Sequence, residues 1–215
     1  MTLYFISGLG ADRRIFEKLM LPSTHKIIFI DWIVPIKNET IENYALRLSV
    51  NINTSEPFSI IGLSFGGIVA IELSKILSPE KIILISSIPS HHDRPWYFNL
   101  LKILPIYKFI PKSFLEIKEP FVYKLMGVTN NEEQMLLHAM LVDTDINLFR
   151  WSVTSILNWE QTTVIKNLHH IHGSADQMFP IKYIKPHYTI KNGKHLMIYT
   201  NASEISSILT RILER

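Results

Sequence analysis

The sequence predicts an α/β fold of three layers, α/β/α, in which helices cover both faces of a mostly parallel sheet of about six strands. Short apolar runs rich in isoleucine recur along the chain, with turn residues at their ends. These runs are nearly continuous rather than alternating, which is typical of parallel strands covered on both faces. Helical patterns separate most of them, and one long helical interval interrupts the alternation.

Strands and helices are expected to alternate from the start of the chain, as in a parallel sheet with crossover helices. The predicted strands are residues 3–7, 26–31, 58–63, 81–86, 165–172 and 187–190. The predicted helices of the core are residues 12–21, 41–53, 65–77 and 202–213.

Residues 89–160, between the fourth and fifth predicted strands, are too many for a loop. Within them Thr129 and Glu132 match a capping box ahead of a helix to about residue 141, Gly127 suits the end of the preceding helix, and Asp145 can cap another through residue 157. We therefore expect a core of residues 1–88 and 161–215, with residues 89–160 as an inserted helical cap. The aromatic residues of this cap either pack it onto the core or line an apolar cavity.

The composition narrows the range of partners. The formal net charge is +3, and no run of five like charges suggests a surface that follows nucleic-acid phosphates. The chain has no cysteine, which excludes disulfides, thiolate metal sites and a cysteine nucleophile. No basic residue precedes the first apolar run, and no apolar stretch approaches the ~20 residues that span a bilayer. We therefore expect a cytoplasmic protein with neither a membrane span nor a nucleic-acid partner.

A sharp serine turn is expected at Gly62-Leu63-Ser64-Phe65-Gly66, between the third strand and the helix after it. A GxSxG pattern in this setting is a nucleophile elbow. Glycine suits the flanking positions because a side chain there would collide with the neighbouring strand or helix. The helix begins directly below the hydroxyl, so its free N–H groups face the point where negative charge would develop. Ser64 is therefore the predicted nucleophile.

The first strand runs into Gly8-Leu9-Gly10, where two glycines allow the backbone to lie close to a ligand. If this strand neighbours the one ending at Leu63, the N–H groups of Leu9 and Phe65 could bind one oxyanion together. Taken alone, Gly8 and Gly10 are equally explained by a plain turn from strand to helix. The predicted serine turn at Ser64 is what favours an oxyanion hole at this loop.

A serine nucleophile needs a base, and nine histidines compete for this role. His195 is favoured because it ends a turn, Asn192-Gly193-Lys194-His195, after the last predicted strand. Open α/β sheets gather their functional residues at the carboxyl ends of strands. The remaining histidines are explained by positions in or beside a strand, within a helix or before a proline-containing loop. We expect no metal, because His169, His170 and His172 have no nearby cysteine or glutamate pair, and no cofactor, because a serine and its base require none.

The imidazole in turn needs an acid that holds its tautomer. Asp176 follows the penultimate strand and therefore also lies at a carboxyl end. Asp93, which follows the fourth strand, is the alternative, whereas Asp143 and Asp145 look like helix-boundary residues.

The chain order serine, aspartate, histidine, with the stretches GLSFGG, HGSAD and GKH, resembles the α/β-hydrolase superfamily over essentially the whole chain. The resemblance implies Ser64 as nucleophile, Asp176 as acid, His195 as base, and the N–H groups of Leu9 and Phe65 as the oxyanion hole. It also implies that residues 89–160 are the variable cap of that superfamily.

The sequence departs from the superfamily pattern at two points. Ser7 stands where a histidine usually precedes the first glycine, which alters the support of the loop but not its backbone donors. The sequence also begins at the oxyanion strand, so the N-terminal hairpin of many members is not expected.

These features predict a serine hydrolase that cleaves an ester or related acyl substrate through an acyl-enzyme. The aromatic cap favours a small apolar substrate. Two alternatives stay open, since fold does not fix function. One is a triad-dependent hydrolase or lyase acting on carbon–carbon bonds, or a hydrolase of short peptides. The other is a ligand-binding protein without catalysis. The sequence does not indicate an oligomeric state.

Overall fold

The computed structural model describes residues 1–115 and 120–214 of the 215-residue chain. Its described strands form one six-stranded sheet in the order β2-β1-β3-β4-β5-β6, and every neighbouring pair is parallel. The predicted sheet is thereby confirmed, and the first strand neighbours the strand that ends at Leu63. The strands are β1 (Thr2–Ile6), β2 (Lys26–Ile30), β3 (Phe58–Leu63), β4 (Lys81–Ile85), β5 (Leu168–Gly173) and β6 (Tyr188–Ile190).

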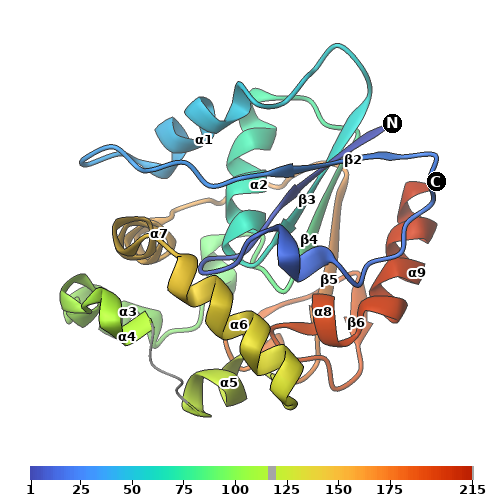
Figure 1. The fold of residues 1–215 in the computed structure, drawn as a ribbon. Coiled ribbons are helices and arrows are strands. Elements are labelled where there is room, and N and C mark those ends of the chain that lie inside the picture. The colour runs from blue at the N-terminus through green and yellow to red at the C-terminus, as the bar shows by residue number, and fades with distance from the viewer. Residues whose placement is uncertain (116–119, 215) are drawn as a thin grey trace.

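Helices cover both faces of this sheet, which gives the predicted three layers (Figure 1). α1 (Ile41–Ser49) and α2 (Phe65–Ile76) lie on one face, and α8 (Met197–Thr200) and α9 (Ala202–Leu213) lie on the other. Alternate residues of β1 enter the two cores, since Tyr4 packs in the cluster of α1 and α2 whereas Phe5 packs in the cluster of α8 and α9. β1 and β3 are buried along their whole length, which explains their unbroken apolar sequence.

The described part of residues 89–160 contains helices and no strand. It contributes buried side chains to both cores, among them Phe98 and Trp159 to the first and Leu137 and Met140 to the second. Its elements are η2 (His91–Asp93), α3 (Phe98–Ile103), η3 (Ile106–Phe109), α4 (Lys112–Leu115), α5 (Pro120–Met126), α6 (Asn131–Asp143) and α7 (Ile146–Asn158). We call residues 89–160 the inserted segment; its separation from the core as a cap stays a prediction.

The capping signals of the inserted segment were partly correct. Asp145 caps α7 as expected, accepting from the N–H groups of the first turn, and Gly127 follows α5 with a φ of 85°. The predicted box at Thr129 is displaced by one residue. Asn130 accepts from the N–H of Glu133, and the Glu133 carboxylate accepts from the N–H of Thr129.

The helix predicted over residues 12–21 is wrong in type and length. Asp12 does cap a helical turn by accepting from the N–H of Arg14, but this turn is the short 3₁₀ helix η1 (Arg13–Phe16). The chain must return along the sheet to begin β2 beside β1, and Leu19 and Leu21 pack against the core on the way. Tertiary packing therefore overrides the local helical pattern here.

β5 also begins later than predicted, at Leu168 rather than at residue 165. Asn167 has a φ of 57°, a turn conformation, and its carbonyl accepts from the N–H of Ile82. Pairing with β4 thus starts only after this turn.

No helix in the described residues is both long enough and apolar enough to cross a membrane.

Candidate active site

Ser64 lies on a tight turn between β3 and α2. Its backbone angles, φ 51° and ψ −118°, are ones that residues other than glycine rarely adopt. Three hydrogen bonds hold this turn. The N–H of Ser64 donates to the carbonyl of Ile85, and the carbonyl of Ser64 accepts from the hydroxyl of Ser87 and the N–H of Gly67. The surrounding residues thus stabilise the strained backbone of Ser64.

Gly62 and Gly66, on either side of Ser64, lie so close to neighbouring main-chain atoms that a side chain would not fit at either position. A Cβ atom on Gly66 would overlap the carbonyl oxygens of Ile6, the last residue of β1, and of Ser7, which follows it. A Cβ atom on Gly62 would lie 2.5 Å from the Gly66 carbonyl oxygen and from the Gly67 Cα. Both approaches involve main-chain atoms, so no side chain could move aside to relieve them.

Ser64, His195 and Asp176 form one continuous hydrogen-bonded chain. The Ser64 Oγ lies 2.9 Å from Nε2 of His195, and Nδ1 of His195 lies 2.9 Å from Oδ2 of Asp176. Because an ionised carboxylate only accepts, Nδ1 carries the ring proton and Nε2 accepts from the serine hydroxyl. The structure therefore brings together the three side chains that the sequence predicted from three separate loops.

The loop after β6 presents His195 through its backbone. Asn192 has a φ of 58°, and the carbonyl of Gly193 accepts from the N–H of Ala175 in the loop that carries Asp176. The two loops are therefore bonded to each other. Asp176 and His195 are each only 4% exposed, so bulk water does not compete for their hydrogen bond.

Asp176 is held as an ion by its own turn. Its Oδ1 accepts from the N–H groups of Met178 and Phe179, at 2.8 and 2.9 Å. Burial acts to raise the pKa of the Asp176 carboxyl, but the charge and hydrogen bond of His195 outweigh it, so the pKa lies below its ordinary value. The acid is thus ionised at neutral pH.

His172 lies behind Asp176 and supports the same turn. It is fully buried, and its Nε2 donates to the carbonyl of Phe179 at 2.8 Å, which leaves Nε2 3.6 Å from Oδ2 of Asp176. Burial lowers the pKa of His172 below its ordinary value, so this ring is neutral at pH 7. Unlike His172, His195 bonds both Asp176, through Nδ1, and Ser64, through Nε2.

Asp93, the alternative acid, is engaged elsewhere. Its Oδ2 accepts from the N–H and the hydroxyl of Ser90, which closes a capping box at η2.

The described residues contain no cluster of three His, Cys, Asp or Glu side chains arranged to hold a metal ion.

The loop after β1 lies against Ser64. A Cβ atom on Gly8 would be 3.3 Å from the Cβ of Ser64. The loop then turns back, since the N–H of Ala11 donates to the carbonyl of Gly8 and the Ser7 hydroxyl donates to the carbonyl of Ala11. Ser7 therefore supports this loop from within. Leu9 occupies the turn itself, and Phe65 is the first residue of α2, where helical N–H groups have no carbonyl partner in their own helix.

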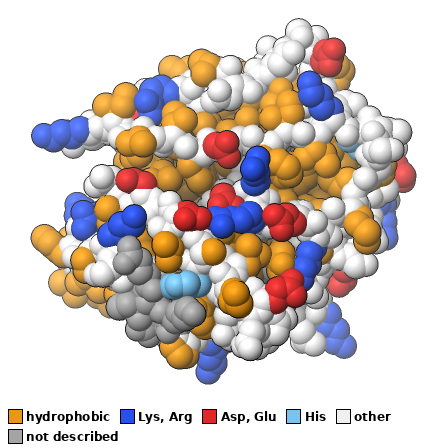
Figure 2. Space-filling model, in the orientation of Figure 1, with side chains coloured by type: hydrophobic (Ala, Val, Ile, Leu, Met, Phe, Trp, Pro, Cys, Tyr) orange, Lys and Arg blue, Asp and Glu red, His pale blue; other side chains and the backbone are white. Residues whose placement is uncertain are grey.

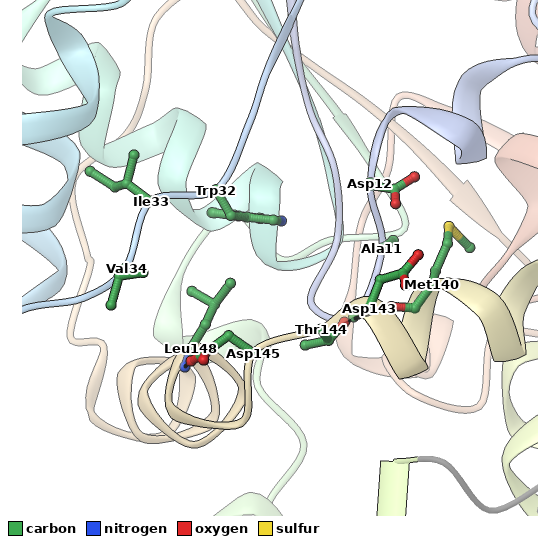
Figure 3. Close-up of a pocket in the computed structure, with 11 residues that line it drawn as sticks. Ala11, Asp12, Trp32, Ile33, Val34, Met140, Asp143, Thr144, Asp145 and Leu148 are labelled. Atoms are coloured by element: carbon green, nitrogen blue, oxygen red, sulfur yellow. Dashed lines mark hydrogen bonds between the residues drawn. The ribbon is translucent and has the colours of Figure 1, made fainter. Parts of the chain in front are cut away.

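A pocket of about 220 Å³ lies between this loop, the segment after β2 and the inserted segment (Figure 3). Trp32 on its wall stacks on Phe65, the residue after Ser64, with ring centroids 5.4 Å apart. Gly10 and Ala11 of the loop line it on one side and Leu148 of α7 on another. The pocket is thus lined by the loop that lies against Ser64 and by a ring that stacks on Phe65, whereas Ser64, Asp176 and His195 do not line it.

The sequence allowed for a cavity lined by aromatic residues of the inserted segment, but none of those that the structure describes lines the pocket, and its actual lining residues were not predicted. Trp32 and Ile33 could have been found, because they follow β2 at the carboxyl edge of the sheet. Met140 and Leu148 carry no such signal, since their place in the pocket depends on how α6 and α7 pack.

An ion-pair bridge crosses the rim of this pocket. Arg14 of η1 lies 2.5 Å from Oδ2 of Asp12 and 2.5 Å from Oδ2 of Asp143, at the end of α6. The bridge joins the core to the inserted segment next to the pocket.

Comparison with solved structures identifies the fold. The chain is similar to a hydrolase from Oleispira antarctica (TM-score 0.77, 14% identity, covering 100% of this chain and 91% of that chain). It is also similar to an esterase from Exiguobacterium antarcticum (0.75, 14%, 100% and 92%) and to a carboxylesterase structure from the Thaumarchaeon Nitrososphaera gargenis (0.73, 16%, 99% and 89%). No family model and no curated protein matches the sequence. The chain has the α/β-hydrolase fold.

Proposed function

We propose that this protein is a serine hydrolase that cleaves an ester or related acyl substrate, small and apolar, through an acyl-enzyme. The observation that carries the proposal is the chain of 2.9 Å contacts from Ser64 to His195 and from His195 to Asp176. The fold shared with structures named as esterases and hydrolases supports it.

In the proposed reaction the Ser64 oxygen attacks the substrate carbonyl while Nε2 of His195 takes the hydroxyl proton. Nε2 then returns this proton to the leaving alcohol, and the acyl group stays on Ser64. A water molecule then attacks the acyl carbonyl while Nε2 takes its proton, the bond to the Ser64 oxygen breaks, and Nε2 returns the proton to that oxygen as the carboxylic acid leaves. The ionised Asp176, whose pKa is held low by His195, stabilises the imidazolium that forms in both steps.

The oxyanion would be held by the N–H groups of Leu9 and Phe65. The contact of Gly8 with Ser64 and the position of Phe65 at the start of α2 support this role. Backbone donors of this kind are fixed before the reaction, and losing one such donor typically costs about 10²–10³ in rate. No metal or cofactor is needed for this chemistry.

The pocket beside Trp32 would receive the acyl group. Its volume of about 220 Å³ is below the roughly 300–1,000 Å³ typical of sites for drug-sized ligands, which favours a short acyl chain. It is lined by the apolar side chains of Trp32, Ile33 and Leu148 together with the carboxylates of Asp12, Asp143 and Asp145.

A fluorophosphonate probe and a panel of aryl esters with increasing acyl length test the proposal. We expect the probe to label Ser64, identified by the mass of its peptide, and the shorter acyl esters to be hydrolysed. Ser64→Ala should abolish the label and lower kcat by about 10⁴–10⁶-fold.

The same panel separates the alternatives. A wild-type protein that takes no label and hydrolyses no ester would contradict the proposal. Labelling of Ser64 without ester turnover would direct attention to carbon–carbon or peptide bonds, and Ser64→Ala that retains wild-type turnover would exclude Ser64 as the nucleophile.

A further inference from the structure

An exposed surface lies on the inserted segment between residues 96 and 112, and it includes none of the three hydrogen-bonded residues Ser64, His195 and Asp176. Six apolar side chains there are each more than half exposed, from 54% for Leu100 to 82% for Phe109. We call this surface the apolar-basic face. Its apolar side chains are Trp96, Leu100, Ile103, Leu104, Ile106 and Phe109.

Helical spacing places these side chains together. Leu100, Ile103 and Leu104 follow the i, i+3, i+4 pattern at α3 and its end, so they share one side of that helix. Ile106 and Phe109 are three residues apart in η3, whose three residues per turn also put them on one side. Figure 2 shows hydrophobic side chains at the lower left of the molecule, where Figure 1 places α3 and α4.

The opposite side of these elements is fixed to the protein. Phe98 and Tyr107 are buried in the core cluster, and the guanidinium of Arg150 donates to the carbonyl of Ile110 at 2.7 Å. The Tyr97 hydroxyl donates to the carbonyl of Met178. The exposed apolar side chains therefore project from an anchored surface and do not belong to a loose loop.

The charges on this face are all of one sign. Lys102, Lys108 and Lys112 are exposed, and none of them forms an ion pair with another residue that the structure describes. The sequence from residue 94 to residue 115 contains no aspartate or glutamate. Glu116 and Glu119, which follow, lie outside the described residues.

This composition distinguishes between possible occupants. Lysine is depleted in protein–protein interfaces, and a symmetric contact between two copies would bring lysines of the same face together. Tryptophan, phenylalanine and leucine interleaved with lysine are instead typical of segments that lie in the headgroup region of a bilayer. Lysine near an anionic lipid surface is attracted to it.

We propose that the apolar-basic face docks the protein on the surface of an anionic lipid bilayer. The apolar side chains enter the headgroup region while the lysines contact lipid phosphates. The proposal does not depend on the triad. α3 and η3 pack on α7, which lines the pocket through Leu148, so docking would hold the pocket one helix away from the lipid.

Vesicle sedimentation tests the proposal with the full chain. We expect binding to vesicles of phosphatidylcholine mixed with phosphatidylglycerol, and much weaker binding to phosphatidylcholine alone. Lys102→Glu with Lys108→Glu should weaken the partition onto anionic vesicles by at least about 30-fold. Ile106→Ser with Phe109→Ser should weaken it by at least about tenfold.

Trp96 supplies an independent readout. Its ring is 68% exposed, so its fluorescence should shift to shorter wavelength on anionic vesicles, and Trp96→Phe should remove that shift. Val164→Ser with Lys166→Glu is the matched control, because Val164 is 89% exposed, Lys166 is exposed and both lie outside the face. This control should bind like the wild type, and unfolding curves should show that every variant is folded.

Two outcomes would overturn the proposal. One is absence of binding to anionic vesicles, or binding that the lysine reversals leave unchanged. The other is self-association of the protein that Ile106→Ser with Phe109→Ser abolishes while vesicle binding is absent, which would make the face a contact between copies of the chain.

Discussion

The core and the inserted segment build their parts of the site in different ways. The core supplies Ser64, Asp176 and His195 from three loops at one edge of the sheet, each fixed by main-chain hydrogen bonds to a neighbouring strand or loop. The inserted segment supplies side chains such as Met140 and Leu148 to the pocket wall. In the proposed hydrolase, backbone positions in the core would thus set the chemistry, whereas the side chains that the inserted helices present would set the size of the acyl group.

Burial follows the same division. Nine of the 12 residues of α2 in the core are buried, whereas α6 in the inserted segment, with 13 residues, buries three. Substitutions in the core are therefore expected to affect rate or folding strongly, and those in the inserted segment to affect preference. The four predictions below test this contrast.

The largest effect on kcat should come from replacing one of the two candidate acids, Asp176 or Asp93, by asparagine in separate variants. Asp176→Asn, in the core, should lower kcat by about 10⁴-fold, because the amide no longer fixes the tautomer or stabilises the imidazolium. Asp93→Asn, in the inserted segment, should leave kcat within about threefold, since Asp93 only caps η2. Steady-state kinetics on one aryl ester measures both. A large loss confined to Asp93→Asn would reverse the contrast.

A change of substrate preference should follow from filling the pocket. Leu148→Trp should lower kcat/KM for the longer acyl esters by about 10–100-fold, because the larger ring occupies the space of the chain. The acetyl ester should change by less than about threefold. Met135→Trp is the control, since Met135 is 67% exposed and does not line the pocket. Equal losses for all acyl lengths would mean that the acyl group binds elsewhere.

Acid sensitivity of folding should come from the core. His170 on β5 is 1% exposed, and burial, with the charges of His172 and His187, lowers its pKa to about 3. The unfolded chain binds that proton near pH 6.5, so stability should fall as the pH falls from about 6.5 to about 3, by at most ~1.4 kcal/mol per pH unit.

His170→Phe should flatten this dependence, because the side chain no longer binds a proton in either state. Urea unfolding at several pH values measures the slope. His92→Asn is the control, since His92 lies exposed in the inserted segment and should leave the slope unchanged. A slope that His170→Phe does not alter would exclude His170 as its source.

The smallest effect should come from the bridge between the two regions. Asp143→Asn removes one of the two carboxylates that bind Arg14. Since the side chain of Asp143 is 61% exposed, we expect a loss of less than about 1 kcal/mol in the free energy of unfolding. Thermal unfolding at low and high salt measures it, because salt should remove the difference. A larger loss would show that the two regions are coupled more tightly than exposed charges allow.

The sequence by itself determined the order of the strands along the chain and the three side chains that the structure joins by hydrogen bonds, Ser64, His195 and Asp176. Both follow from local rules, because the apolar strand, the glycines and the serine of the elbow are adjacent in sequence and each constrains the next. The same holds for Asp176 and His195, which follow strands whose carboxyl ends must meet at one edge of a parallel sheet.

Only the tertiary structure decided the remaining features. The segment after Asp12 is a short 3₁₀ turn rather than a helix because the chain must return to pair β2 with β1. The N–H of Phe179 bonds Asp176, and the buried ring of His172 bonds the carbonyl of Phe179; no sequence motif indicates either contact. The pocket between Trp32 and Leu148 exists because α7 packs over the loops of the sheet. Local sequence constrains neighbours along the chain, but contacts between distant segments are set by packing, and the pocket consists of such contacts.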